Sequence, residues 1–310
     1  MNSRRHFLKQ LASASALIGT ASFPFEAFAK NDVVKITILH TNDVHSHIEP
    51  FPENDFKYPG MGGIARRMAL IDYIRNTEKN VLLFDAGDIF QGTPYFNMFN
   101  GELEMKLMSK MQYDAGTIGN HDFDNGVDGL SSQLIHANFP LLNCNYDFSG
   151  TSMAGKTKPY QIFEKENIRI GVFGLGIELK GLVDSKLYGA TKYLDPLENA
   201  AVISHKLKHE EKCDLIICLS HLGYKYEDTK LSDTILAKKS LNIDLIIGGH
   251  THTFLDTPYQ INNRDNKKVL IAQVGWAGLK LGKVDFYMAK GKEKKLALAN
   301  AINIDGKIFG

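Results

Sequence analysis

Short apolar runs alternate with helical patterns along most of the chain. Four runs rich in Val, Ile and Leu, at residues 33–40, 81–84, 215–219 and 245–247, have the length and composition of buried strands, and a fifth strand is expected at residues 114–118. Between them, apolar residues recur every three or four positions, which predicts helices over residues 64–76, 103–111 and 197–209. This alternation of strands and helices predicts an α/β fold.

The last part of the chain has a different pattern. Three strand-like runs follow one another at residues 269–275, 281–289 and 296–304, and a charged stretch at 290–295 is expected to form a solvated hairpin turn. No internal repeat, linker or low-complexity stretch interrupts residues 30–310. We therefore expect a single domain over residues 30–310.

The first residues have the pattern of an export signal. Arg4 and Arg5 precede a weakly apolar stretch at 11–25, and Ala27-Phe28-Ala29 supplies the small residues of a cleavage site. This order of charged, apolar and small residues, with two adjacent arginines, predicts a signal peptide of the twin-arginine type at residues 1–29. It therefore predicts a periplasmic or otherwise exported protein. An amphipathic helix or membrane anchor is the alternative. No later run reaches the ~18 apolar residues of a bilayer-spanning helix, so no membrane span is expected.

Composition and charge exclude several classes of protein. The chain has 36 Lys and Arg against 35 Asp and Glu, a net charge of +1, and 44% hydrophobic residues. A strongly basic nucleic-acid binder and a disordered chain are both disfavoured. Three cysteines are too few for a disulfide framework, and we interpret Cys144, Cys213 and Cys218 as small buried hydrophobic residues.

Polar and titratable residues follow all five predicted strands. Such residues at the carboxyl ends of core strands mark the usual position of a site in α/β folds. Carboxylate oxygens and imidazole nitrogens are ligands for Zn²⁺, Mn²⁺ or Fe. The wide spacing of the motifs along the chain excludes a local metal loop and favours a site assembled by the finished fold. The residues concerned are Asp43, His45, Asp88, Asn120, His121, His221, His250 and His252.

The order of these motifs resembles a known family. The set D-x-H, G-D, G-N-H-D, x-H and G-G-H-x-H is similar to that of the calcineurin-like metallophosphoesterases. Within that family, LHTNDVHSH, GDIFQGTP, GNHDFDNG, SHLG and GGHTHT resemble the catalytic domain of bacterial exported 5′-nucleotidases, over about residues 33–290. The resemblance implies a two-sheet αββα sandwich with two divalent metal ions, of Zn, Mn, Fe or Mg.

The resemblance also implies a role for each residue. One metal site would use Asp43, His45, Asp88 and His252. The second would use Asp88, Asn120, His221 and His250, with Asp88 bridging the two ions. His121 and Asp124 resemble the catalytic pair of the family. A metal-bridging hydroxide would then attack phosphorus in line with the leaving oxygen.

Each of these residues also has a simpler interpretation. A single Asp or Asn after a strand is more often a turn cap than a ligand, although six in one order reverse that expectation. His252 has the alternative of a surface loop histidine, and His121 that of a residue that only supports the ligands. Asp124 has the alternative of capping a helix that starts near Gly126.

Several neighbouring residues are given simpler expectations. His40 is expected in the core and His47 in a solvated loop, with a substrate contact as the alternative for His47. Arg66 is expected at a salt bridge or in solvent rather than at a phosphate. Asn143 is considered for a minor site role. Core packing is expected for the aromatic residues after Asp88, with a pocket wall as the alternative, namely for Phe90, Tyr95 and Phe96.

The leading functional hypothesis is a dinuclear-metal phosphatase that acts on 5′-nucleotides or related monoesters. The alternatives are a cyclic-nucleotide phosphodiesterase, a thiosulfohydrolase on the same scaffold, or a binding subunit without turnover. Exported 5′-nucleotidases usually carry a C-terminal domain that binds the base, whereas this sequence ends at Gly310. The resemblance therefore does not fix the nucleotide specificity, and one hypothesis is that a separate polypeptide supplies such a domain.

Overall fold

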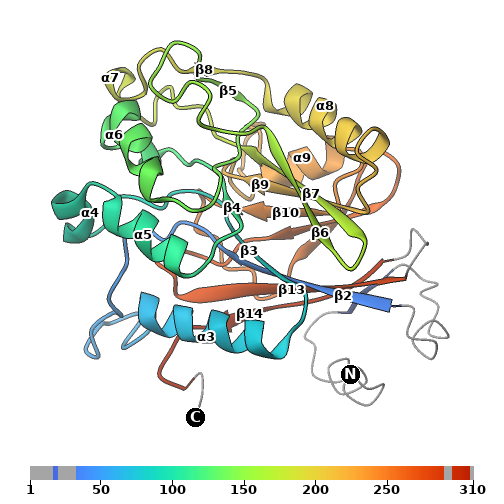
Figure 1. The fold of residues 1–310 in the computed structure, drawn as a ribbon, viewed down its shortest axis with the longest axis horizontal. Helices are drawn as coiled ribbons and strands as arrows, with labels where there is room; N and C mark the ends of the chain where they lie inside the picture. Colours follow the sequence, from blue (N-terminus) through green and yellow to red (C-terminus); the bar gives the residue numbers. More distant parts are fainter. Residues whose placement is uncertain (1–16, 20–32, 290–294, 308–310) are drawn as a thin grey trace.

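The computed structural model describes residues 17–19, 33–289 and 295–307, and two sheets form the centre of the molecule (Figure 1). The predicted signal at 1–29 lies outside the described residues except for the strand β1 (Leu17–Gly19). Most of the predicted turn at 290–295 also lies outside them.

The first sheet carries three of the predicted site motifs, which follow its strands β2, β3 and β4. Its strand order is β1-β14-β13-β2-β3-β4. Strands β2, β3 and β4 run parallel, whereas β13 and β14 add to β2 in an antiparallel arrangement. The bounds are β2 Val33–Thr41, β3 Val81–Asp85, β4 Ala115–Gly116, β13 Lys280–Ala289 and β14 Lys295–Asn303.

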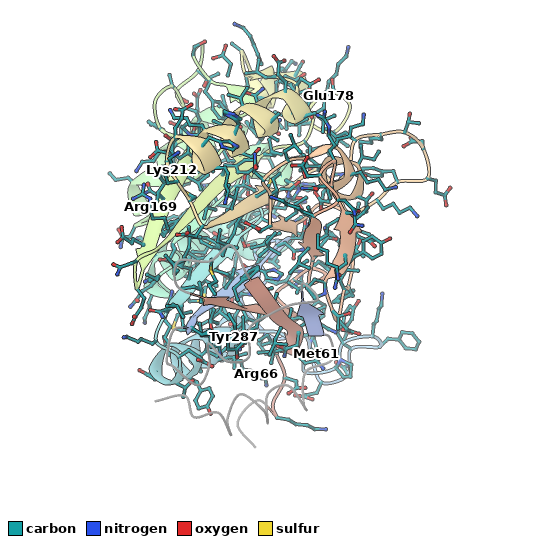
Figure 2. The ribbon with its side chains drawn as sticks, turned by 90° about the vertical axis from the view of Figure 1, so that its right-hand side faces the viewer. Met61, Arg66, Arg169, Glu178, Lys212 and Tyr287 are labelled. Carbon is teal, nitrogen blue, oxygen red and sulfur yellow. The ribbon has the colours of Figure 1, made fainter. Side chains whose placement is uncertain are left out.

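The second sheet carries the remaining strand-end histidines. Its order is β11-β12-β10-β9-β7-β6, in which β12, β10, β9 and β7 are parallel. Arg169, in β7, and Lys212, just before β9, lie at one side of the molecule, whereas Glu178, beyond the end of β7, lies away from them (Figure 2). The bounds are β6 Tyr160–Lys165, β7 Ile168–Leu175, β9 Leu215–Ser220, β10 Leu245–Gly248, β11 Tyr259–Asn262 and β12 Lys268–Ala272.

An apolar layer fills the space between the two sheets. Ile38 and Phe84 of the first sheet pack in one buried cluster with Val172 and Ile217 of the second. Burying such side chains contributes about 1.5–3 kcal/mol each relative to exposure, so this layer holds the sheets face to face. It also explains why the central strands β3, β9 and β10 have continuous apolar runs, since both faces of these strands are covered.

Helices cover the outer face of each sheet. Apolar residues of α3 (Ile64–Thr77), α5 (Glu102–Lys110) and α6 (Gly126–Gln133) join a cluster with the first sheet. Those of α8 (Pro196–His209) and α9 (Asp233–Lys239) join a cluster with the second. The predicted αββα sandwich is therefore confirmed. The smaller elements are α4 Pro94–Phe99, α7 Ser185–Tyr188, the 3₁₀ turns His121–Phe123 and Leu134–His136, and the strand pair β5 Tyr146–Asp147 and β8 Lys192–Tyr193.

One predicted strand is shorter in the structure, and one hairpin has no counterpart among the predictions. The run at 114–118 forms only the two-residue strand β4, because the amide of Leu142 already pairs with the Gly116 carbonyl and the chain then turns toward the site. The hairpin of β6 and β7 was not predicted. Glu166 and Asn167, at its turn, both have positive φ, as a tight hairpin turn requires.

Two of the three cysteines are buried, as expected. Cys144, Cys213 and Cys218 are free thiols; Cys213 and Cys218 are buried, and Cys144 packs partly exposed against the core. Among the described residues, no helix is both long enough and apolar enough to cross a bilayer.

Candidate metal centre

The carboxyl ends of strands from both sheets meet in one place. β2 leads to Asp43 and His45, and β3 leads to Asp88. Backbone and side-chain hydrogen bonds join these ends to those of β9 and β10. The amide of His250 donates to Asp43 Oδ1 at 2.9 Å, and Nδ1 of His221 donates to the Ala86 carbonyl at 2.7 Å. Residues 207 positions apart in the sequence are thus fixed side by side.

Asp43, His45 and His252 form the first group of candidate ligands. Their ligand atoms lie within 4.8 Å of one another. Nε2 of His45 lies 3.0 Å from Nε2 of His252, which in turn lies 3.6 Å from Asp43 Oδ1. Nδ1 of His45 faces the carbonyls of Phe90 and Gln91, so the proton is held on Nδ1 and the lone pair of Nε2 points into the group. Two imidazole nitrogens beside a carboxylate make a donor set that suits a cation.

Asp88, His221 and His250 form the second group, again with all ligand atoms within 4.8 Å. The His221 side chain is fully buried, and its Nε2 lies 3.1 Å from Asp88 Oδ2 without a well-aligned hydrogen bond. Asn120 Oδ1 lies 2.8 Å from Nδ1 of His250, so its amide oxygen belongs to the same cluster. A buried nitrogen without a hydrogen-bond partner fits a divalent cation at this position.

Asp88 lies between the two groups. Its Oδ2 is 3.1 Å from Nε2 of His221 and 3.8 Å from Nε2 of His45. Its Oδ1 accepts a hydrogen bond from the amide of His121 at 2.8 Å. One carboxylate therefore faces imidazoles of both groups.

Burial and mutual charge shift the pKa values of these groups. Burial lowers the pKa of His250 to about 3 and that of His252 to about 4, so both imidazoles are neutral, which is the form that binds a metal. For His221, burial lowers the pKa but the Asp88 carboxylate outweighs it, and the pKa rises to about 10. The Asp88 carboxylate thus stabilises a positive charge next to Nε2 of His221, and a bound cation would supply such a charge.

The backbone around the ligands is strained. Five of the seven candidate ligands have φ between 49° and 71°, a region that non-glycine residues seldom adopt: Asp43, His45, Asp88, His250 and His252. Such residues each cost of the order of 1–2 kcal/mol and persist where surrounding contacts impose them. Strain concentrated at strand ends is typical of functional sites, and it turns these side chains toward one point.

Glycines in the motifs allow the strand ends to approach closely. A Cβ on Gly119 would lie 2.2 Å from Asp88 Oδ1, and a Cβ on Gly249 would lie 2.8 Å from both the Ala86 carbonyl and Nδ1 of His221. The glycine of the G-N-H-D motif and the second glycine of G-G-H-x-H are therefore required by packing against Asp88 and His221.

Asp122 supports the Asp88 loop, a role that was not predicted. Its carboxylate accepts hydrogen bonds from the backbone amides of Asp88, Ile89, Phe90 and Gly119, at 2.8–3.2 Å. Burial raises the pKa of Asp122 to about 7. The only available signal was its place in the G-N-H-D motif, because a residue that binds backbone amides leaves no pattern of its own.

Asn42 is a second supporting residue that sequence reasoning missed. Its side-chain NH₂ donates to Asp43 Oδ2 and to the Gly275 carbonyl, both at 2.6 Å, and its oxygen accepts from the amide of Val274. It joins the β2 motif to the loop that follows β12 and fixes the orientation of the Asp43 carboxylate.

His121 and Asp124 form a hydrogen-bonded pair at the rim. Nδ1 of His121 lies 2.8 Å from Asp124 Oδ2, and the His121 ring is 5.2 Å from that of His45. The hydrogen bond that His121 donates to the Asp124 carboxylate raises the pKa of His121 against the effect of burial. The alternative of a helix cap for Asp124 does not hold, since the residue before α6 is Asn125 and Asp124 bonds His121 instead.

Other predictions have mixed outcomes. His40 is buried in β2, as expected. The prediction of a solvated loop for His47 is wrong, because its ring is half-buried and stacks on Phe51 at 5.1 Å. Arg66 donates to the Gly60 carbonyl and lies at the end of the molecule opposite Glu178 (Figure 2). Asn143 accepts from two backbone amides of its own turn, so the structure gives it a local structural role.

The aromatic residues after Asp88 divide into two sets. Phe90 and Phe96 are buried and pack on each other at 5.4 Å, as expected. Tyr95 lines a surface cavity, which is the alternative that was left open.

Comparison with known families agrees with this geometry. The sequence model of the calcineurin-like phosphoesterases matches residues 36–254, which include every candidate ligand. The chain belongs to this family.

Curated relatives and solved structures of the family are similar over much of this chain. It is 32% identical to a 5′-nucleotidase of Vibrio vulnificus, over 96% of this chain and 58% of that protein. It is 35% identical to the snake venom 5′-nucleotidase of Crotalus adamanteus, over 80% of this chain and 44% of that protein. The chain thus spans about half the length of these relatives.

A solved 5′-nucleotidase precursor from Thermus thermophilus superposes with a TM-score of 0.80 and 31% identity, over 89% of this chain and 55% of that one. The calcineurin-like phosphoesterase YfkN from Bacillus subtilis has a TM-score of 0.73 and 27% identity, over 90% of this chain and 93% of that one.

Proposed function

We propose that this chain is a metal-dependent phosphomonoesterase that acts on 5′-nucleotides. The observation that carries the proposal is the pair of facing ligand groups, with the buried, unpartnered Nε2 of His221 between carboxylates. The 5′-nucleotidases among its relatives support the substrate class. Because the chain spans about half of their length, the substrate remains part of the proposal.

In this proposal, Asp43, His45, Asp88 and His252 would hold one divalent ion. Asp88, Asn120, His221 and His250 would hold the other, so Asp88 would contribute to both sites. When bound, the two ions would supply a hydroxide nucleophile at neutral pH and neutralise charge on the phosphoryl oxygens. The buried carbonyl contacts of His45 and His221 keep their Nε2 atoms turned toward the other candidate ligands.

His121 acts at the leaving side of the reaction. Asp124 accepts the Nδ1 proton of His121 and holds the ring in the tautomer and orientation that place Nε2 toward the site. Because the Asp124 carboxylate raises the pKa of His121, the ring can carry a second proton on Nε2, and this imidazolium donates a hydrogen bond or that proton to a phosphoryl or leaving-group oxygen as negative charge develops there. The partly exposed His121 side chain leaves room for a substrate to approach.

The test is turnover with a defined metal. Purified protein is assayed with Mn²⁺, Zn²⁺ or Mg²⁺ against 5′-AMP, a cyclic nucleotide, a simple phosphate ester and a thiosulfate conjugate. We expect hydrolysis of the monoesters, its loss in Asp88→Asn, and unchanged rates in the exposed control Asp128→Asn. Wild-type rates in Asp88→Asn would contradict the dinuclear mechanism. Turnover of only the cyclic nucleotide would favour a phosphodiesterase, and turnover of only the thiosulfate conjugate would favour a thiosulfohydrolase. The absence of turnover on every substrate would favour a binding subunit.

We further propose that residues 1–29 direct export through the twin-arginine route and that residues 30–310 are the catalytic domain. The support is the S-R-R-x-F-L-K pattern ahead of a weakly apolar stretch. Replacing Arg4 and Arg5 by Lys should keep the protein inside the cell and unprocessed. Export of that variant at the wild-type level would contradict the assignment.

A further inference from the structure

A cavity of about 740 Å³ lies beside the candidate metal centre. One wall is residues 47–52, and the other is formed by residues 93–95 and Met98. Both walls continue from the ligand motifs, because His47 is two residues after His45 and the Thr93 hydroxyl donates to the Ser46 carbonyl at 2.7 Å. The volume falls within the ~300–1,000 Å³ usual for small-molecule sites.

A chain of aromatic rings joins this cavity to a candidate ligand. The His252 ring stacks on Trp276 with centroids 5.6 Å apart and planes 4° from parallel. Trp276 meets His47 edge to face at 5.3 Å, and His47 stacks on Phe51 at 5.1 Å. Because His47 and Phe51 line the cavity and Trp276 lies between His47 and His252, a group inside the cavity is joined through these rings to a ligand of the first metal group.

The chemistry of the walls favours an uncharged planar occupant. Among the described residues that line the cavity, none is Lys or Arg, so no permanently charged cation there pairs with a phosphate, and Glu49 would repel one. Met98 is 70% exposed, an apolar surface with no covering group in the described part of the chain. Polar groups are also available, since the Tyr95 hydroxyl donates to Glu49 at 3.1 Å and can exchange that bond for one to a ligand.

We propose that this cavity receives the leaving group of the substrate, an uncharged aromatic ring system with the dimensions of a purine nucleoside. The inference rests on the proposed phosphatase function, because it places the phosphate at the metals and the nucleoside against Phe51. It gives the catalytic domain a recognition site of its own for the base.

Binding of adenosine tests the cavity without metal or turnover. Trp276 is the only tryptophan of the chain, so its fluorescence reports on the rings next to the cavity. Adenosine is titrated into protein kept in a chelator, with ribose as the control ligand. We expect a saturable change with adenosine and none with ribose. The absence of a saturable change in the wild type would overturn the proposal.

Two phenylalanines close in the sequence provide a matched pair of variants. Phe51→Ala removes a wall of the cavity, whereas Phe56→Ala removes a fully exposed ring that does not line it. Losing one stacking partner should weaken adenosine binding by about tenfold in Phe51→Ala, with no change in Phe56→Ala. Equal affinity of Phe51→Ala and the wild type would overturn the proposal. Should Phe51→Ala fail to fold, the exposed Met98→Ala variant serves the same comparison.

Steady-state kinetics then distinguish the contribution of nucleoside binding in the cavity from that of the metal-dependent step. With one saturating metal, kcat/KM is compared for 5′-AMP and for glycerol phosphate, which has no ring. Phe51→Ala should lower the value for 5′-AMP by about tenfold and leave that for glycerol phosphate unchanged. Equal losses on both substrates would overturn the cavity assignment. If the wild type hydrolyses neither substrate, the proposed function fails, while adenosine binding still decides whether the cavity takes a nucleoside.

Discussion

The two groups of candidate ligands differ in how one imidazole of each, His221 in the second and His252 in the first, is held. In the second group, the His221 side chain is fully buried and its Nδ1 is fixed by the Ala86 carbonyl. In the first, the side chain of His252 is 40% exposed and is positioned mainly by stacking on Trp276. A buried group that is bonded to the backbone has one accessible position, whereas a stacked ring at the rim keeps some freedom. We therefore expect that changing a ligand of the second group lowers activity more than changing a ligand of the first group.

The largest effect should follow the loss of His221. His221→Ala leaves Asp88 buried without its facing imidazole, and we expect kcat/KM to fall by more than about 100-fold, beyond the range for residues that only support ligands. Excess metal should not restore it. His209→Ala, at an exposed histidine of α8, is the control and should match the wild type. If high metal concentration restored the activity of His221→Ala, the second group would not be the more sensitive of the two to the loss of a ligand.

Removing the charge of Asp122 should act on stability as well as on activity. In Asp122→Asn an NH₂ group would face some of the four backbone amides that now donate to the carboxylate, and we expect a loss of about 2 kcal/mol in the free energy of unfolding. Urea denaturation measures this, with the exposed Asp128→Asn as the matched variant. A stability equal to that of Asp128→Asn would mean that the Asp88 loop does not depend on Asp122.

His252→Gln should have a milder and reversible effect. A glutamine oxygen can replace Nε2 as a ligand at the rim, so we expect metal affinity to fall about tenfold and activity to return with excess metal. Metal titration followed by activity measures both quantities. A loss as large and as irreversible as that of His221→Ala would remove the difference between the groups.

His40 offers a contrast with His221, since both histidines are buried but only His221 faces a carboxylate. Nδ1 of His40 has no hydrogen-bond partner, and burial lowers the pKa of His40 from 6.5 to about 3. Between these values the unfolded chain binds the extra proton and the folded chain does not, so stability falls as the pH drops below 6.5. Lowering the pH from 6.5 to 5 should therefore reduce the free energy of unfolding of the wild type by about 1.5 kcal/mol more than that of His40→Leu. Parallel pH profiles of the two proteins in urea denaturation would contradict this.

The sequence was most informative where chemistry is confined to a few residue types. Aspartate and histidine at the ends of apolar runs predicted the site, because strand order brings those ends together and few other residues bind metals. The β6–β7 hairpin was missed, because β6 is only half-buried along its length and does not give a clear apolar run.

Supporting residues were harder to predict than ligands. Asp122 acts through backbone amides of a loop whose path is known only after folding. His47 was expected in solvent, but it lies against Phe51 and Trp276, which come from distant parts of the chain. Tertiary contacts of this kind leave no periodic pattern in the sequence.

The metal content of the protein tests the central claim most directly. After loading with Mn²⁺ or Zn²⁺ and removal of free ions, elemental analysis should find two ions per chain in the wild type and fewer in Asp88→Asn, whose amide is a poorer bridge than the carboxylate. A wild-type protein that retains one ion or none, or an Asp88→Asn variant that retains two with wild-type affinity, would contradict a dinuclear centre bridged by Asp88.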